Sequence, residues 1–430
     1  MQADKELAQY CIERLLAAGA DKSQCVLTLS EKSEFNVAND DISLLRTTLG
    51  ADVSLTALVD GRKGSIVINQ LERDAIDAAA RDVVELARNS QPDEANDIAE
   101  AGEPKSFESG DSAPKLELMH ERLSRFLGYV KERYPRTGQE EVQLDFTTAS
   151  QQFSNSNGVD FAEREGLYSF STFFTSREGK NSSSFNYTGF KRRNLDAELF
   201  EIGSVDRLLR ESGEQIVTKG IGKKFVGKVV MTPDCLPSFL GSFAGFLGDM
   251  AMISGTSIYK DSIGESIADP RFSLHCRPRS DEIAAGYAVT GDGFEAQDCT
   301  LVDGGVLRSQ LLGLYGSRKT GKARAANHGG AFVIDPGASS FEEMIAGIGE
   351  GLVLGRFSGG HPSSNGDFTG VAKNSYYVKD GKVAWPISEV MISGNIAQML
   401  KDIDSISAER VDYGDAILPW ICVNGISVSG

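Results

Sequence analysis

The sequence predicts an α+β protein in which an N-terminal antiparallel sheet, with helices on one face, precedes a Gly-rich, β-dominated C-terminal domain. Two observations carry this prediction. Helix-like and strand-like apolar periods follow one another in the first half of the chain, whereas short apolar runs separated by glycine fill the second half. The chain has 430 residues and 40% apolar content, which allows two or three domains with a sizeable core.

The first elements are a helix and an antiparallel meander. Residues 5–18 place leucine and isoleucine at helical spacing before Gly19. Short runs that alternate or are rich in β-branched residues follow at 26–29, 34–37, 43–48, 52–59 and 65–69. Residues 60–64, Asp-Gly-Arg-Lys-Gly, are a hairpin turn signal. Apolar positions three and four apart between Ile76 and Ala87 then predict a helix across one face of the sheet.

A second helix-and-strand unit is expected further along. Residues 90–114 are rich in Asp, Glu, Ser, Pro and Gly, which predicts a solvated acidic linker. Residues 116–134 have a helical pattern, and alternation between 142 and 187 predicts strands. The predicted domains are therefore residues 1–220, made of segments 1–89 and 115–220 joined by that linker, and residues 224–430.

Charge and cysteine content narrow the class of protein. The net charge of −17 repels phosphate backbones, so direct binding of nucleic acid is not expected. The six cysteines lie far apart and form no C-x-x-C motif, and the N-terminus lacks a basic start followed by an apolar run. We therefore expect a cytoplasmic protein. The most apolar window, residues 236–253, is interrupted by small and polar residues, which favours a buried helix over a membrane span.

Local catalytic and metal-binding motifs fail in this sequence. The four histidines, at 120, 275, 328 and 361, are too far apart to form a local metal pair. His120-Glu121 begins like a zinc-protease helix, but no second histidine follows. Residues 316–322 match the spacing of a phosphate-binding loop, yet Ala323 stands where Ser or Thr is required. We predict no catalytic residue and no metal ligand in this chain.

The apolar helix expected from Leu236 has a second distinctive face. Its large side chains share one face, and Gly241, Gly245 and Gly248 fall together on another. Two interpretations are open. The glycine face packs against a strand of the same chain, or it admits another backbone, belonging to a partner chain or a bound peptide.

A polar, Gly-rich loop at residues 363–370 and the strand ending at Asn395 are a second candidate site. Such loops expose backbone groups that pair with an extended peptide, and the alternative is a long hairpin connection. The candidate peptide-binding residues are Gly366, Asp367, Thr369, Gly370, Ser393, Gly394 and Asn395.

Several motifs of the second half, taken in order and spacing, carry a family resemblance. They are Gly255–Tyr259, Asn327–Gly330, Gly351–Leu354, Gly366–Ala372, Lys379–Val383, Pro386–Asn395 and Gly425–Gly430. Together they resemble the TldD/PmbA family, once labelled modulators of DNA gyrase, and specifically its PmbA (TldE) branch. The N-terminal meander and helix look similar too, so the resemblance covers most of the chain.

The resemblance implies a function without a catalytic centre in this chain. The family's catalytic branch carries H-E-x-x-x-H and acts as a zinc metallopeptidase, whereas residues 239–247 here hold no His, Glu or Cys. We therefore expect a non-catalytic subunit of a TldD/TldE-type peptidase that degrades or trims peptides and small unfolded proteins. Zinc is expected only in a TldD-like partner. The alternative is a self-assembling peptide- or protein-binding protein without proteolytic activity.

Overall fold

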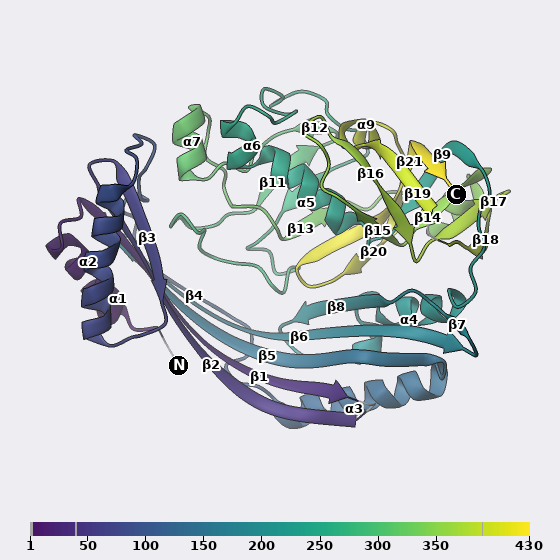
Figure 1. Ribbon diagram of the computed structural model, residues 1–430, viewed down its shortest axis with the longest axis horizontal. Coiled ribbons are helices and arrows are strands. Elements are labelled where there is room, and N and C mark those ends of the chain that lie inside the picture. The colour runs from purple at the N-terminus through teal and green to yellow at the C-terminus, as the bar shows by residue number, and fades with distance from the viewer. Residues whose placement is uncertain (1–2, 39–40, 389) are drawn as a thin grey trace.

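The computed structural model describes residues 3–38, 41–388 and 390–430, and its strands form two sheets (Figure 1). An 8-stranded, mainly antiparallel sheet comes from the N-terminal half, and a 13-stranded mixed sheet comes from the C-terminal half. This confirms the predicted α+β fold class. The C-terminal sheet lies over the concave side of the long, curved N-terminal strands (Figure 1).

The N-terminal sheet has the strand order β3-β2-β1-β5-β6-β4, and β7 and β8 also pair with β6. The short runs predicted before residue 59 merge into long strands, because β1 and β2 pair from Lys22↔Leu58 to Ala38↔Asp41 with one register shift, between Asn36 and Val37. Asp60 and Gly61 turn the chain into β3 with φ of 48° and 71°, as the hairpin signal predicts. The strands are β1 Lys22–Ala38, β2 Asp41–Val59, β3 Arg62–Ile68, β4 Lys105–Ser109, β5 Thr137–Asn155, β6 Asp160–Glu178, β7 Asn181–Ser182 and β8 Asn186–Arg192.

The helices of this half lie on one face of the sheet (Figure 1). Alternate side chains of β1 point to that face, where Leu27 packs with one cluster of helices and Phe35 with another. The helical elements are α1 Lys5–Ala17, α2 Arg73–Asn89, α3 Leu116–Arg133, the short 3-10 turn Leu199–Glu201 and α4 Val205–Glu214. The opposite face contacts the C-terminal half, since Phe153 and Phe161 pack with Ala288 and Val289.

The segment 90–114 is not the solvated linker that its composition predicts. Ala95, Ile98 and Ala99 are buried, and β4 adds to the sheet in parallel with β6. The Asn155 Nδ2 donates to the Ala99 carbonyl at 2.8 Å. A few small apolar residues and a paired backbone therefore fix this acidic segment against the fold, which a count of large apolar residues does not reveal.

The C-terminal sheet is organised around its last strand, β21, which pairs with β9, β13, β19 and β20. Its main path runs β12-β11-β10-β13-β21-β9-β14-β17-β18. The strands are β9 Lys224–Met231, β10 Leu274–Cys276, β11 Cys299–Asp303, β12 Val306–Leu307, β13 Phe332–Ile334, β14 Glu350–Leu354, β15 Arg356–Gly359, β16 Asp367–Lys373, β17 Tyr376–Lys379, β18 Lys382–Pro386, β19 Val390–Asn395, β20 Ile403–Asp412 and β21 Ala416–Ser429.

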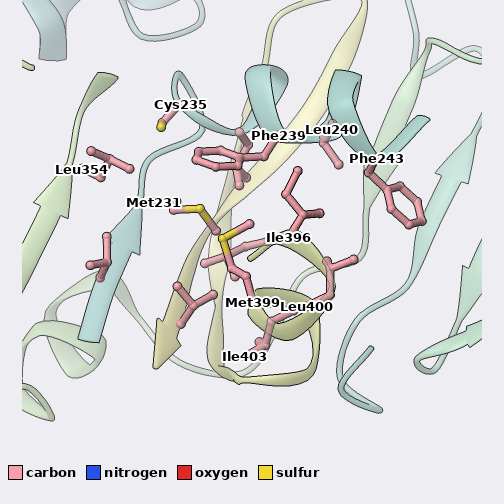
Figure 2. Packing of buried hydrophobic residues seen from close by; sticks show 14 of the residues in the cluster. Met231, Cys235, Phe239, Leu240, Phe243, Leu354, Ile396, Met399, Leu400 and Ile403 are labelled. Atoms are coloured by element: carbon pink, nitrogen blue, oxygen red, sulfur yellow. The ribbon is translucent and has the colours of Figure 1, made fainter. Parts of the chain in front are cut away.

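The apolar window at 236–253 forms two helices and not one. The chain leaves helical geometry at Gly248, whose ψ is 170°, between α5 and α6. Figure 2 shows the large α5 side chains, such as Phe239 and Phe243, pointing toward Met399 and Leu400 of α9 in the main core. No helix formed by the described residues is long and apolar enough to cross a membrane. The helices of this half are α5 Leu236–Leu247, α6 Asp249–Ile253, α7 Leu314–Thr320, α8 Phe341–Ala346 and α9 Ile396–Lys401.

Candidate functional site

The glycine face of α5 is open. Gly241 and Gly245 are exposed, and no heavy atom of the described residues lies within 4 Å of a Cβ built on either one. Gly248 has a different role, since it ends α5 and caps α6. Of the two interpretations left open by the sequence, packing of this face against a strand of the same chain is therefore excluded at Gly241 and Gly245. Approach by another backbone stays a prediction.

A cavity of about 740 Å³ runs along this face of α5. Its second wall is the end of β15 and the residues that follow it. The residues from α5 and from the β15 side that line the cavity are Pro237, Ser238, Phe239, Gly241, Ser242, Gly245 and Phe246, and Phe357, Gly359, Gly360, His361 and Pro362. Ala251 and Thr256 also line it. The cavity is therefore bounded largely by small residues that leave backbone accessible.

The strand β15 has an unpaired edge on this side. Within the part of the chain that the structure describes, β15 pairs only with β16. The Phe357 N–H faces the other way, toward the Cys235 thiol just before α5. Since backbone groups two residues apart on a strand point the same way, the N–H and C=O of Gly359 also face the unpaired edge. That edge can accept one more strand.

A second cavity of about 510 Å³ lies beside the first turn of α5 and shares Pro237, Ser238 and Gly241 with the first. Its charged lining residues are Asp234, Asp415 and Arg356, the first residue of β15. The Arg356 guanidinium donates to the Asp234 carbonyl at 3.0 Å and stacks over the Tyr187 ring with 4.0 Å between guanidinium carbon and ring centroid. The beginning of β15 is thus fixed to β8 of the N-terminal sheet.

A buried polar network holds the start of α5 in place. The Asp234 carboxylate pairs with Arg207 of α4 and accepts from the Ser204 hydroxyl at 3.1 Å. The Ser204 and Tyr413 hydroxyls lie 3.0 Å apart. Burial, with the Asp234 charge nearby, raises the pKa of Tyr413 well above its usual value, so this phenol stays protonated. The network joins α4 and the turn between β20 and β21 to the segment that leads into the cavity helix.

The predicted peptide-binding residues lie together, but in a paired sheet. In the register of β16 and β19, Asp367 lies opposite Asn395 and Thr369 opposite Ser393, and β15 pairs with the other edge of β16 from Gly370 onward. The groove expected between these segments is therefore filled by their own hydrogen bonds. Contact of these residues with a peptide stays a prediction, and the edge open to strand addition in this sheet is that of β15.

Glycines in this pair of strands make room for aromatic rings. A Cβ on Gly370 would lie 2.5 Å from the Phe357 ring, and one on Gly394 would lie 2.9 Å from the Phe368 ring. Gly366 has φ of 90°, which favours glycine at the turn before β16. These three residues are required by packing and backbone conformation. Glu389, within the motif that precedes Asn395, lies outside the described residues.

The cavity does not fit a zinc ion. Among the described residues that line it, His361 is the one ionisable side chain, and α5 presents glycine and serine where metal ligands would be needed. Nowhere in residues 3–38, 41–388 and 390–430 do three His, Cys, Asp or Glu side chains converge as metal ligands. No catalytic step through a metal is therefore derived for this chain.

The segment that matches phosphate-loop spacing forms most of α7 and the turn after it. The Asp249 carboxylate accepts from the Gly313 N–H at 2.9 Å and from the Gly316 N–H at 3.2 Å. A carboxylate of the same chain thus occupies amides that a phosphate would need. This agrees with the conclusion that the spacing alone marks no nucleotide site.

Fold and site together define a two-sheet α+β protein with an open backbone-lined cavity and no set of metal ligands along it. Residues 224–430 match the model of the PmbA/TldA metallopeptidase C-terminal domain. The chain belongs to the PmbA/TldD metallopeptidase family. Its relative in Haemophilus influenzae, named metalloprotease PmbA homolog, is 23% identical, with 99% of this chain and 96% of the relative covered.

Solved structures share the whole fold. TldE from Thermococcus kodakarensis superposes with a TM-score of 0.83 at 18% identity, covering 99% of this chain and 100% of that one. A proposed modulator of DNA gyrase from Bacteroides thetaiotaomicron gives 0.85 at 22% identity, covering 99% and 98%. At these identities the structural likeness establishes the fold.

Proposed function

We propose that this chain is a non-catalytic, peptide-binding subunit of a TldD/TldE-type zinc metallopeptidase. One observation carries the proposal. An open cavity lies between the glycine face of α5 and the unpaired edge of β15, at the helix where the catalytic branch of the family is expected to carry H-E-x-x-x-H. The described residues along this cavity include no set that could hold a metal.

The chemistry of this cavity suits an extended peptide. The open groups of Gly359 offer a donor and an acceptor to a peptide backbone, and Gly241 and Gly245 let that backbone pass close to α5. The wall has one ionisable side chain, His361, among the residues described, so side-chain preference is weak. Recognition through the main chain fits a peptidase that acts on many unfolded sequences.

The test is reconstitution with a TldD-like chain that carries H-E-x-x-x-H. We expect cleavage of an unfolded peptide to require both chains, and zinc, measured by elemental analysis, to travel with the TldD-like chain. A His→Ala change in that motif is expected to abolish cleavage while the complex still elutes as one species. Cleavage by this chain alone, with zinc that is lost in His361→Ala, would overturn the proposal.

The same samples distinguish a peptidase subunit from the alternative, a binding protein without a proteolytic partner. A purified chain that binds the peptide but forms no complex with any H-E-x-x-x-H chain of the same genome contradicts the subunit role. Peptide affinity of the chain alone is measured by fluorescence anisotropy, so that loss of binding and loss of a partner are separated.

A further inference from the structure

The strand β2 has a long unpaired edge at the margin of the N-terminal sheet (Figure 1). On one side β2 pairs with β1 from Asp41 to Leu58, with one register shift at Ser43. On the other side β3 pairs only with residues 53–59. Over residues 41–52 the outer backbone groups therefore have no strand beside them in the ranges that the structure describes.

This edge carries exposed leucines and few protective residues. The side chains of Leu45 and Leu49 are 52% and 63% exposed. Both lie on the helix-covered face of the sheet, because Leu45 is opposite Phe35 in the β1–β2 register, yet α2 and α3 leave them uncovered. Monomeric proteins usually blunt such an edge with Lys, Pro or a bulge. In β2 a register shift leaves Ser43 without an opposite residue, and the strand from Leu44 to Ala51 has no Lys, no Pro and no further shift. Between Ile42 and Ala51 the one charged residue is Arg46, already paired with Glu34 at 2.7 Å.

A second copy of the same strand matches this edge. A two-fold axis normal to an antiparallel sheet sets one residue opposite its own copy, and opposed side chains share a face. If the axis passed beside Arg46, the two like-charged Arg46 guanidinium groups would lie opposite each other. If it passed beside Leu45, the apolar Leu49 of one copy would lie opposite the charged Asp41 of the other. An axis at Thr47 sets Leu45 against Leu49 twice and Arg46 against Thr48. It also pairs residues 44–50, between the register shift at Ser43 and residue 53, where pairing with β3 begins.

We infer that two copies of this chain pair through β2, antiparallel and centred on Thr47. The pairing joins both N-terminal sheets into one and covers Leu45 and Leu49 of each copy. This surface is separate from the α5 cavity and does not rest on the proposed function, and the chain alone suffices to test it.

Cysteine cross-linking tests the register. With Thr47→Cys, opposed Cβ atoms at about 4.5–5.5 Å allow a disulfide between copies under mild oxidation. Thr48→Cys is the matched control, because its partner in this register is Arg46 and its own copy is two positions away. Five native cysteines are buried and Cys299 is partly exposed, so the unmodified chain gives the background. A reducible dimer with Thr47→Cys and background levels with Thr48→Cys are expected.

A second pair of variants tests the leucines. Leu49→Lys is expected to weaken dimerisation about tenfold in multi-angle light scattering over a dilution series, because it replaces both Leu45–Leu49 contacts. Leu86→Lys, on the exposed side of α2 at 51% exposure, should leave dimerisation unchanged. Unaltered thermal melting checks that both variants fold. A monomeric wild type, or a dimer that neither cross-links at Thr47 nor weakens in Leu49→Lys, would overturn the inference.

Discussion

The Asn395 Nδ2 donates to Asp367 Oδ1 at 2.9 Å across the β16–β19 pair. The carbonyl oxygen of the same Asn395 side chain accepts from the Gln398 N–H at 3.1 Å and caps α9. One asparagine thus fixes the Gly-rich loop and the helix whose Met399 and Leu400 pack in the main core (Figure 2). The polar residues of this loop are joined to the core of the domain.

Asp367→Ala should therefore lower the melting temperature. The side-chain amides of Asn395 and Asn365 hydrogen-bond the carboxylate and lower its pKa. A carboxyl group with a lowered folded pKa stabilises the fold above its unfolded pKa and loses this effect as pH falls through the folded value. The difference in melting temperature between wild type and variant should shrink on acidification. An unchanged melting temperature with weaker peptide binding would instead support contact of Asp367 with the substrate.

Gly245→Leu should block the cavity without destabilising the chain. A Cβ there has no heavy atom of the described residues from outside the helix within 4 Å, and leucine is a better helix former than glycine by about 0.5–1 kcal/mol. Its side chain fills the space beside the β15 edge, so peptide affinity should fall at least about tenfold, a change of about 1.4 kcal/mol.

The control for this change is Gly128→Leu, on an exposed and equally open position of α3. Both variants are measured by urea unfolding and by anisotropy with the same labelled peptide. Equal peptide affinity in Gly245→Leu and Gly128→Leu would refute the cavity as the binding site.

Asp234→Ala should destabilise the protein by about 3 kcal/mol, because it removes the more deeply buried of the two carboxylates that pair with the Arg207 guanidinium and leaves it Glu211. The Asp234 side chain is 2% exposed. The control, Asp303→Ala, removes an ion pair with Arg308 in which the Asp303 side chain is 60% exposed. It should lower the free energy of unfolding by less than about 1 kcal/mol. Urea unfolding of the two variants gives both values, and similar costs would mean that the buried network does not hold α4 against the C-terminal sheet.

Glu165→Gln should remove a pH dependence of stability. Burial against the C-terminal half, with the Glu163 charge nearby, raises the pKa of Glu165 to about 7. The folded chain then keeps a proton that the unfolded chain releases, so stability falls as pH rises from about 4.3 to about 7. At pH 8 the variant should be more stable than wild type by about 3 kcal/mol, and near pH 4 the two should be alike. Parallel pH profiles from urea unfolding would contradict this assignment.

Local signals in the sequence predicted the four longest helices, α1, α2, α3 and α5, and missed α4, α7, α8 and α9. Residues 5–18 and 116–134 are helical within a residue or two, because their apolar spacing and the packing of α1 and α3 agree. Asp380 and Gly381 turn between β17 and β18 with φ of 50° and 72°, which their residue types favour. The break of the helix at Gly248 was missed, since glycine within an apolar window does not by itself end a helix.

The candidate site depended on information that local patterns do not contain. The open edge of β15 follows from which strands pair with β16, and the Arg207–Asp234–Ser204–Tyr413 network joins residues from distant parts of the chain. The glycines of α5 were found because their helical spacing is local. The β15 edge beside them was missed because it is set by tertiary pairing.

The place of β21 in the C-terminal sheet has a consequence for biosynthesis. The strand β9 pairs with β14 on one side and with β21 on the other. Residues 224–231 therefore cannot form all their strand hydrogen bonds until residues 416–429 have been translated. The N-terminal sheet, whose strands end at Arg192, has no such delay and can form while the ribosome is still translating the rest. Until β21 is made, β9, β13, β19 and β20 each lack a neighbour, and it is in this interval that the chain most needs a chaperone.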